Sequence, residues 1–114
     1  MLAEFSAAWN SHDVDAVMEF FADDAVYVAA RGTLPDGERM EGREAIRAGI
    51  ASRLGAVDDL AFVDNEYLRC GPDAFFSKWR MTGNGGEINV RGCDFYRVRD
   101  GKVLLKDSFL KADG

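Results

Sequence analysis

A two-residue turn near the C-terminus, Asp100-Gly101, constrains the fold more than any other feature of the sequence. Asp-Gly between alternating apolar runs is typical of a type I′ β-hairpin, and such a turn fixes which residues face each other across the strands. With Arg99 and Lys102 closing the turn, the register predicts the pairs Val98 with Val103, Tyr96 with Leu105, and Asp94 with Asp107. Because side chains alternate with period two, all three pairs lie on one face. Two carboxylates are therefore expected to meet across the last two strands.

An Asn-Gly turn at Asn84-Gly85 predicts a second hairpin directly before the first. Its register places Met81 opposite Ile88 and Trp79 opposite Val90. The face predicted to point inward comprises Phe75, Ser77, Trp79, Met81, Ile88, Val90, Gly92, Asp94, Tyr96, Val98, Val103, Leu105, Asp107 and Phe109. The opposite face is mostly charged, and we expect it to meet water; its apolar exceptions are Phe76, Cys93, Phe95, Leu104 and Leu110.

The aspartates Asp94 and Asp107 are the exceptions on the inward face, and they point to a site. Burying an aspartate costs several kcal/mol unless it is paired, hydrogen-bonded or protonated. Two carboxylates at cross-strand distance are expected to share a proton, which raises the pKa of one of them. An acid beside a base, enclosed by aromatic side chains, can perform general acid–base catalysis on an apolar substrate. The alternatives are that an aspartate is bound by a backbone N–H or by the Arg or Lys of a helix lid, or that the register slips.

The N-terminal half carries the helices, because apolar residues recur there at helical spacing. The sequence predicts a first helix from Leu2 to about Ser11, a second that starts after the N-cap Asp13 and reaches Phe21, and a third over residues 43–54. A short strand is predicted over residues 25–30, a loop over 31–42, and a long strand of undetermined inward parity over 57–70.

This order predicts an α+β fold in a single domain over residues 1–114, with about three helices on the concave face of a cone-shaped, curved antiparallel (mixed) sheet. Helices and sheet are expected to enclose a pocket. The residues predicted to line it are Phe5, Trp9, Tyr27, Ile50, Trp79, Met81, Tyr96 and Phe109.

Composition excludes several classes of function. The net charge of −6 argues against nucleic acid as a partner. The two cysteines, Cys70 and Cys93, and the single histidine have no metal-ligand spacing, so neither a zinc site nor a redox pair is expected. No glycine-rich phosphate loop follows a strand, and we therefore expect no cofactor. No apolar run reaches membrane-spanning length and no signal peptide is recognisable, which predicts a cytoplasmic protein without membrane contact.

Four segments carry a resemblance to a known superfamily. They are Ala8-Trp9-Asn10 followed by Asp13, Phe21-Ala22-Asp23-Asp24-Ala25-Val26, Gly42-Arg43-Glu44-Ala45-Ile46, and Gly92-Cys93-Asp94-Phe95-Tyr96 with Asp100-Gly101-Lys102-Val103. With the order of elements, these segments make the chain similar to the nuclear transport factor 2-like superfamily. That superfamily includes SnoaL-like polyketide cyclases, ketosteroid isomerases, scytalone dehydratase and limonene epoxide hydrolase.

The resemblance implies roles for single residues. Asp94 matches the protonated aspartate of ketosteroid isomerases, but Phe5 and Ala29 stand where those enzymes hold a tyrosine and a general base. Asp107 resembles an aspartate of the epoxide hydrolases, whose other catalytic positions carry Lys78 and Arg80 here. The resemblance therefore implies neither of these two mechanisms as a whole.

Two hypotheses of function follow. The first is a cofactor-free isomerase, cyclase or dehydratase-like enzyme that uses Asp94 and Asp107 on an apolar carbonyl or hydroxylated molecule. The second is a non-catalytic ligand-binding or association module of the same fold, since a fold does not dictate a function. In either case we expect a small hydrophobic ligand and a homodimer formed through the outer sheet face.

Overall fold

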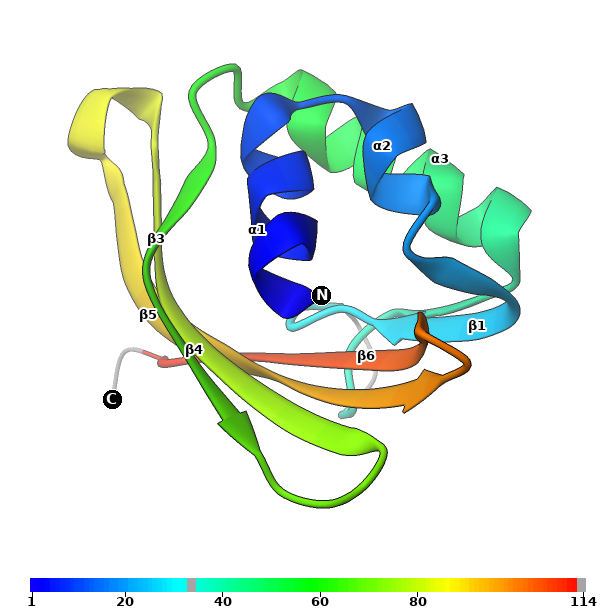
Figure 1. Ribbon diagram of the computed structural model, residues 1–114. Coiled ribbons are helices and arrows are strands. Elements are labelled where there is room, and N and C mark those ends of the chain that lie inside the picture. Colours follow the sequence, from blue (N-terminus) through cyan, green and yellow to red (C-terminus); the bar gives the residue numbers. More distant parts are fainter. Residues whose placement is uncertain (33–34, 113–114) are drawn as a thin grey trace.

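The computed structural model describes residues 1–32 and 35–112, in which three helices lie over one face of a curved sheet (Figure 1). The helices are α1 (Leu2–Ser11), α2 (Val14–Met18) and α3 (Arg43–Ala56). The strands are β1 (Phe21–Val28), β2 (Arg39–Glu41), β3 (Ala61–Arg69), β4 (Ala74–Gly83), β5 (Ile88–Arg99) and β6 (Lys102–Leu110), with a 3₁₀ turn, η1 (Asn84–Gly86), between β4 and β5.

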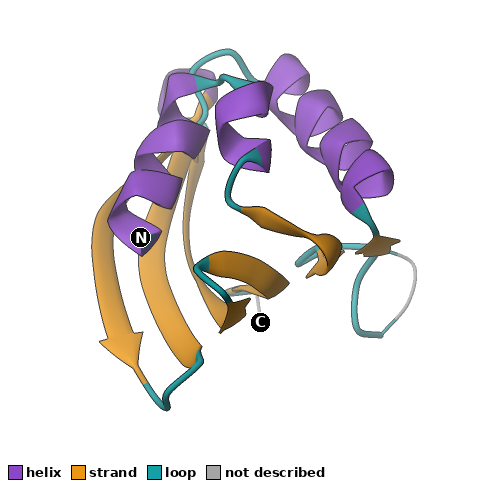
Figure 2. Cartoon of the chain, turned by 45° about the vertical axis from the view of Figure 1, so that its right-hand side comes forward, coloured by secondary structure: helices purple, strands orange, loops and turns teal. Residues whose placement is uncertain are grey.

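The sheet is mixed, with the strand order β2-β1-β6-β5-β4-β3. Among the described strands, only β1 and β6 pair in parallel, and the other neighbouring pairs are antiparallel. The helices cover the hollow side of the sheet from α1 above β3 and β4 to α3 above β1 (Figures 1 and 2). The predicted α+β class and its layer arrangement are confirmed.

The three helices begin where short-range signals place them, but the boundary between α2 and β1 differs from the prediction. Asp13 caps α2, because its side chain accepts a hydrogen bond from the backbone N–H of Ala16. The helix stops at Met18, so the prediction that it reaches Phe21 is wrong. Phe21 instead opens β1, which starts four residues earlier than predicted. The predicted loop over residues 31–42 contains the short strand β2, and its positions 33 and 34 lie outside the described residues.

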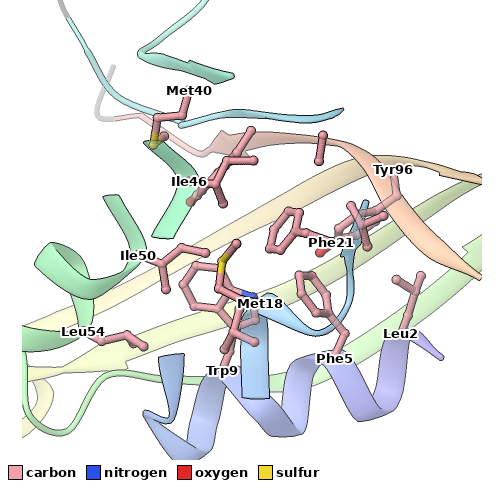
Figure 3. Packing of buried hydrophobic residues seen from close by; sticks show 14 of the residues in the cluster. Leu2, Phe5, Trp9, Met18, Phe21, Met40, Ile46, Ile50, Leu54 and Tyr96 are labelled. Atoms are coloured by element: carbon pink, nitrogen blue, oxygen red, sulfur yellow. The ribbon is translucent and has the colours of Figure 1, made fainter. Parts of the chain in front are cut away.

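Between the helices and the sheet lies a core of buried apolar side chains (Figure 3). Phe5 of α1 makes T-shaped ring contacts with Trp9, Phe21 and Tyr96. Ile50 of α3 is fully buried in the same cluster. Close packing of this kind holds the helical layer against the sheet.

The β4–β5 hairpin has a longer turn than predicted. Four residues separate Gly83 from its partner Ile88, and the side chain of Asp59 accepts hydrogen bonds from the N–H groups of Asn84 and Gly85. The pairing therefore slips by two residues, and Trp79 lies opposite Gly92 rather than Val90. A slip of two preserves the faces, so the predicted inward side chains of β4 and β5 still point inward.

The β5–β6 hairpin contains the main departure from the prediction. Its Asp100-Gly101 turn forms with positive φ at both residues, and Val98 pairs with Val103 as predicted. Arg97 then pairs with Leu105, so Leu104 has no partner and forms a β-bulge. One extra residue reverses every following side chain of β6. The pairs that result include Tyr96 with Lys106, Phe95 with Asp107, and Asp94 with Ser108.

The bulge corrects several sequence-based expectations. The predicted Asp94–Asp107 pair does not exist, because Asp107 now faces the outer side of the sheet. Phe109, predicted to line the pocket, is 51% exposed. Leu110 and Leu104, predicted to point outward, pack partly buried against the core.

A second bulge interrupts β3, the strand for which the sequence did not determine which side chains point inward. The register against β4 shifts between Val63 and Glu66, and Asp64 has a φ of 55°. The shift turns the side chain of Asn65 inward, toward α1.

Candidate functional site

Asp94 lies at the centre of a buried polar cluster on the inner face of the sheet. Its side chain is 4% exposed, in an interior that is otherwise mostly apolar. Trp79 Nε1–H donates to Asp94 Oδ2 over 2.7 Å, and the Tyr96 hydroxyl donates to the same oxygen over 2.9 Å. The Ser77 hydroxyl lies 3.5 Å from this oxygen.

The other carboxylate oxygen of Asp94 faces β6. Lys106 Nζ lies 3.1 Å from Asp94 Oδ1 and donates over 2.8 Å to Ser108 Oγ, whose hydroxyl in turn donates to Oδ1. Each partner is placed by the sheet register. Ser77 and Ser108 are the direct cross-strand neighbours of Asp94, and Lys106 pairs with Tyr96, two residues further along β5.

The position of the Trp79 indole depends on a glycine. A Cβ at Gly92 would lie 2.5 Å from the Trp79 ring and 2.5 Å from the backbone oxygen of Phe109. Glycine is therefore required for this close approach, which allows the indole to lie across β5 and direct its N–H to Asp94.

Lys106 is a buried ammonium group with aromatic neighbours. Its Nζ lies 4.6 Å from the centre of the Tyr27 ring and 5.2 Å from that of Trp9. Burial is the largest single effect and lowers the pKa of Lys106, but the charge of Asp94, its hydrogen bond to Lys106 and the influence of Tyr27 together outweigh burial, and the net pKa is raised. The group is therefore a permanent cation at neutral pH, and the ring faces stabilise it further.

Tyr96 is a neutral donor in this cluster. Burial raises the pKa of its phenol well above the usual value, and the charge of Asp94 raises it further. Asp94, Lys106 and Tyr96 together form a charge-balanced site. The site thus replaces the predicted proton-sharing pair of aspartates with an aspartate–lysine ion pair.

Asp107 lies outside this cluster. Partial burial raises the pKa of its carboxyl, and the negative charges of Asp36 and Asp94 raise it further. The shift has the predicted direction, but its main cause is burial on the outer face rather than contact with a second carboxylate.

A cavity of about 20 Å³ lies beside Asp94 and Lys106, large enough for about one water molecule. Two buried polar atoms with no partner among the described residues belong to its lining, the donor Trp9 Nε1 and the acceptor Asn65 Oδ1. The orientation of the Asn65 amide is fixed, because its Nδ2 donates over 3.0 Å to the backbone oxygen of Phe62. A hydroxyl group or water fits this site, since it can accept from Trp9 and donate to Asn65.

A much larger cleft, of about 900 Å³, opens between α3, the start of the 31–42 segment and the ends of β4, β5 and β6. Its volume falls in the range of small-molecule sites. Apolar walls come from both layers and include Met40, Leu60, Met81, Ile88, Val90 and Leu110. Tyr27 links the two sites, because it lines the cleft while its ring contacts Lys106.

The predicted site residues separate into three groups in the structure. Phe5, Trp9, Trp79, Asp94 and Tyr96 line the small cavity. Tyr27 and Met81 line the large cleft. Ile50 is buried in the core and lines neither, while Asp107 and Phe109 lie on the outer face.

Sequence reasoning missed Lys106 as well as the serines on either side of Asp94. The signal that could have revealed Lys106 is the run Val103-Leu104-Leu105, because three consecutive apolar residues break strict alternation and are compatible with a bulge. Asn65 and Arg53, which line the small cavity and the cleft, were also missed.

Within residues 1–32 and 35–112, no three His, Cys, Asp or Glu side chains are placed to hold a metal ion. Of the helices in this part of the chain, none has both the length and the apolar character needed to cross a membrane.

Comparison with known proteins gives a family and a fold. The family model of the SnoaL-like domain matches residues 2–105. An NTF2-like protein of unknown function from Mesorhizobium loti is 27% identical, with a TM-score of 0.81 over 97% of this chain and 88% of its own. A proposed polyketide cyclase from Xanthomonas campestris pv. campestris is 21% identical, with a TM-score of 0.78 over 96% of this chain and 87% of its own. Another, from Pseudomonas putida KT2440, is 15% identical, with a TM-score of 0.81 over 96% of this chain and 88% of its own.

The similarity to the two proposed cyclases shows that they have the same fold as this chain. No curated protein sequence matches the chain. Since the family model covers nearly all of its residues, the chain belongs to the SnoaL-like domain family of the NTF2-like superfamily.

Proposed function

We propose that this protein is a cofactor-free acid–base enzyme that acts on a small, largely apolar carbonyl or hydroxylated molecule. The reaction class is isomerisation, cyclisation or dehydration through an enol or enolate. The observation that carries the proposal is the buried ion pair of Asp94 and Lys106, next to a cleft of small-molecule size.

A buried ion pair of this kind is poorly explained by stability alone. Well-packed apolar side chains of similar volume would stabilise the interior as well or better, because charges lose solvation on burial. Titratable groups in such environments cluster at functional sites. Two structural relatives described as proposed polyketide cyclases support the same reaction class, because polyketide cyclisation is carbonyl chemistry.

In the proposed mechanism, Tyr27 donates a hydrogen bond to the substrate, and Lys106 acts on it through its positive charge without touching it. A substrate carbonyl oxygen at the inner end of the cleft accepts a hydrogen bond from the Tyr27 hydroxyl. A carboxylate on the cleft wall, Glu38 or Glu87, accepts the proton that leaves the α-carbon, and the Lys106 ammonium behind the Tyr27 ring stabilises the negative charge that develops on the carbonyl oxygen as the enolate forms. Asp94, which already accepts several hydrogen bonds, keeps Lys106 charged and in place.

Deuterium exchange tests the proposal without knowledge of the product. A panel of cyclic ketones, 1,3-dicarbonyl compounds and aromatic polyketide-like acids is incubated in D₂O, and exchange at the α-carbon is followed by NMR. We expect wild-type protein to accelerate exchange of at least one compound, and Lys106→Met and Tyr27→Phe to abolish the acceleration. Lys102→Met is the matched control, because it makes the same substitution on the same strand at a residue exposed on the surface.

Equal acceleration by Lys106→Met and wild type would refute the role of the ion pair. Binding of panel compounds in the cleft without exchange of any would favour the alternative hypothesis, a non-catalytic ligand-binding module.

A second proposal concerns self-association through the outer sheet face. Four apolar side chains are exposed there, Val63 (37%), Leu68 (65%), Phe76 (40%) and Phe109 (51%), and Phe76 packs on Phe95. We propose that these residues form a homodimer contact, in place of the predicted contribution of Leu104 and Leu110. Sedimentation equilibrium at micromolar concentration should show a dimer that Phe76→Ser weakens, and a monomer throughout would refute it. We also propose a cytoplasmic location. Cys70 and Cys93 are free thiols, which are typical of proteins in a reducing compartment.

A further inference from the structure

The charges of the large cleft differ in sign from those of the whole protein. The chain has a net charge of −6, yet three cations and two carboxylates line the cleft. The cations are Arg31, Arg53 and Lys111, and the carboxylates are Glu38 and Glu87. A cleft that is locally positive on an acidic protein favours a negatively charged ligand.

Arg53 is the cation best placed to contact such a ligand. It extends from the last turn of α3 and is half-buried, whereas Arg31 and Lys111 are exposed. Its Nη2 donates over 3.1 Å to the sulfur of Met81, which is a weak acceptor. Among the described residues, no carboxylate lies within ion-pair distance of Arg53.

Two surface arginines, Arg47 and Arg80, differ from Arg53 in this respect. Arg47, on the same helix, pairs with Asp15 on the surface, and Arg80 pairs with Asp64 on the outer face. A guanidinium has five N–H donors in a planar fork that matches the two oxygens of a carboxylate. Arg53 therefore has most of its donor capacity available toward the cleft.

We propose that the cleft binds an organic acid, an apolar molecule whose carboxylate is held by Arg53 while its remaining atoms lie between the two layers. The inference rests on the proposed function, since it assigns a substrate class to the same cleft. Met81 lies under the Arg53 guanidinium, and the apolar side chains Met40 and Val90 also line the walls. Anchoring the carboxylate at this wall leaves the far end of the ligand to extend toward Tyr27, where the carbonyl chemistry is proposed.

Binding of 2-naphthoate and its neutral analogue 2-naphthamide tests the proposal. Both present the same apolar ring system, so the difference in affinity reports the carboxylate. By isothermal titration at pH 7 we expect the acid to bind about tenfold more tightly than the amide, which corresponds to about 1.4 kcal/mol. NMR signals of the Met81 methyl group should shift in the same titration if the ligand lies in this cleft.

Variants assign the preference to one residue. Arg53→Met should bind acid and amide with equal affinity, whereas Arg47→Met, which loses the same charge from the same helix outside the cleft, should keep the preference. Arg53→Lys retains the charge but not the fork, and it should recover part of the preference. Circular dichroism of each variant verifies that it is folded.

Three results would overturn the inference: equal binding of acid and amide by wild type, no binding of either, or a preference that persists in Arg53→Met. Failure here is distinguishable from failure of the proposed function. Exchange of neutral ketones that depends on Lys106, without a carboxylate preference, would remove only the substrate class. A preference that depends on Arg53, without any exchange, would remove the enzyme and keep the ligand.

Discussion

Replacing Lys106 with methionine removes one partner of the buried ion pair while nearly preserving the length of the side chain. Asp94 then keeps its carboxylate in the interior without a counter-charge. Breaking a buried pair in this way costs about 3 to 5 kcal/mol. The lower end applies here, because the indole of Trp79 and the hydroxyls of Tyr96 and Ser108 still donate to the carboxylate.

We therefore expect Lys106→Met to lose about 3 kcal/mol of unfolding free energy. A domain of this size has about 5 to 15 kcal/mol in total, so the variant should fold with a clearly reduced stability. Urea denaturation at pH 7, followed by Trp fluorescence and by circular dichroism, measures the loss. Coincident transitions by the two probes would justify a two-state treatment.

A double-mutant cycle with Asp94→Asn isolates the pair from its neighbours. Asp94→Asn alone leaves the ammonium without a counter-charge, whereas the double variant leaves no charge in the interior. We expect the double variant to lose less stability than the sum of the single variants, by about 2 kcal/mol. Additivity within about 0.5 kcal/mol would refute the assignment of a direct, buried charge pair.

Three further predictions concern single groups. Asp107→Asn should leave deuterium exchange unchanged. It should also raise stability at pH 7 but not at pH 3, because the raised pKa of Asp107 in the folded state penalises folding only above its unfolded value of 3.8; lost exchange would return Asp107 to the site. In alkaline urea titrations, wild-type stability should fall above about pH 10. The raised pKa values of Tyr96 and Lys106 contribute stability that is complete below their unfolded values of 10.0 and 10.5 and is lost as the pH rises toward their folded values; a flat profile would contradict this. The Trp9 indole proton should show an NOE to a long-lived water that also contacts Asn65, because buried donors and acceptors are normally satisfied; rapid exchange of this proton with bulk solvent would contradict it.

Local signals in the sequence were sufficient to predict the fold class and the main helices and hairpins. The apolar periodicity of the first half, the cap at Asp13 and the Asp100-Gly101 turn act over a few residues, and all three appear in the structure. The inward faces of β4 and β5 were also predictable, because a two-residue slip at the preceding turn leaves side-chain parity unchanged. Asp94 could be identified for the same reason, as a charged residue on an apolar face.

The partner of Asp94 was decided by tertiary structure. Short-range alternation extended through β6 predicts Asp107 beside Asp94, whereas the unpaired Leu104 reverses the strand and brings Lys106 inward. The bulge lies where β6 must pair at once with β5 and with β1, a strand some eighty residues earlier in the chain. An apolar interior tolerates a carboxylate only together with donors, and the reversed strand supplies an ammonium and a hydroxyl where the regular one would add a second negative charge.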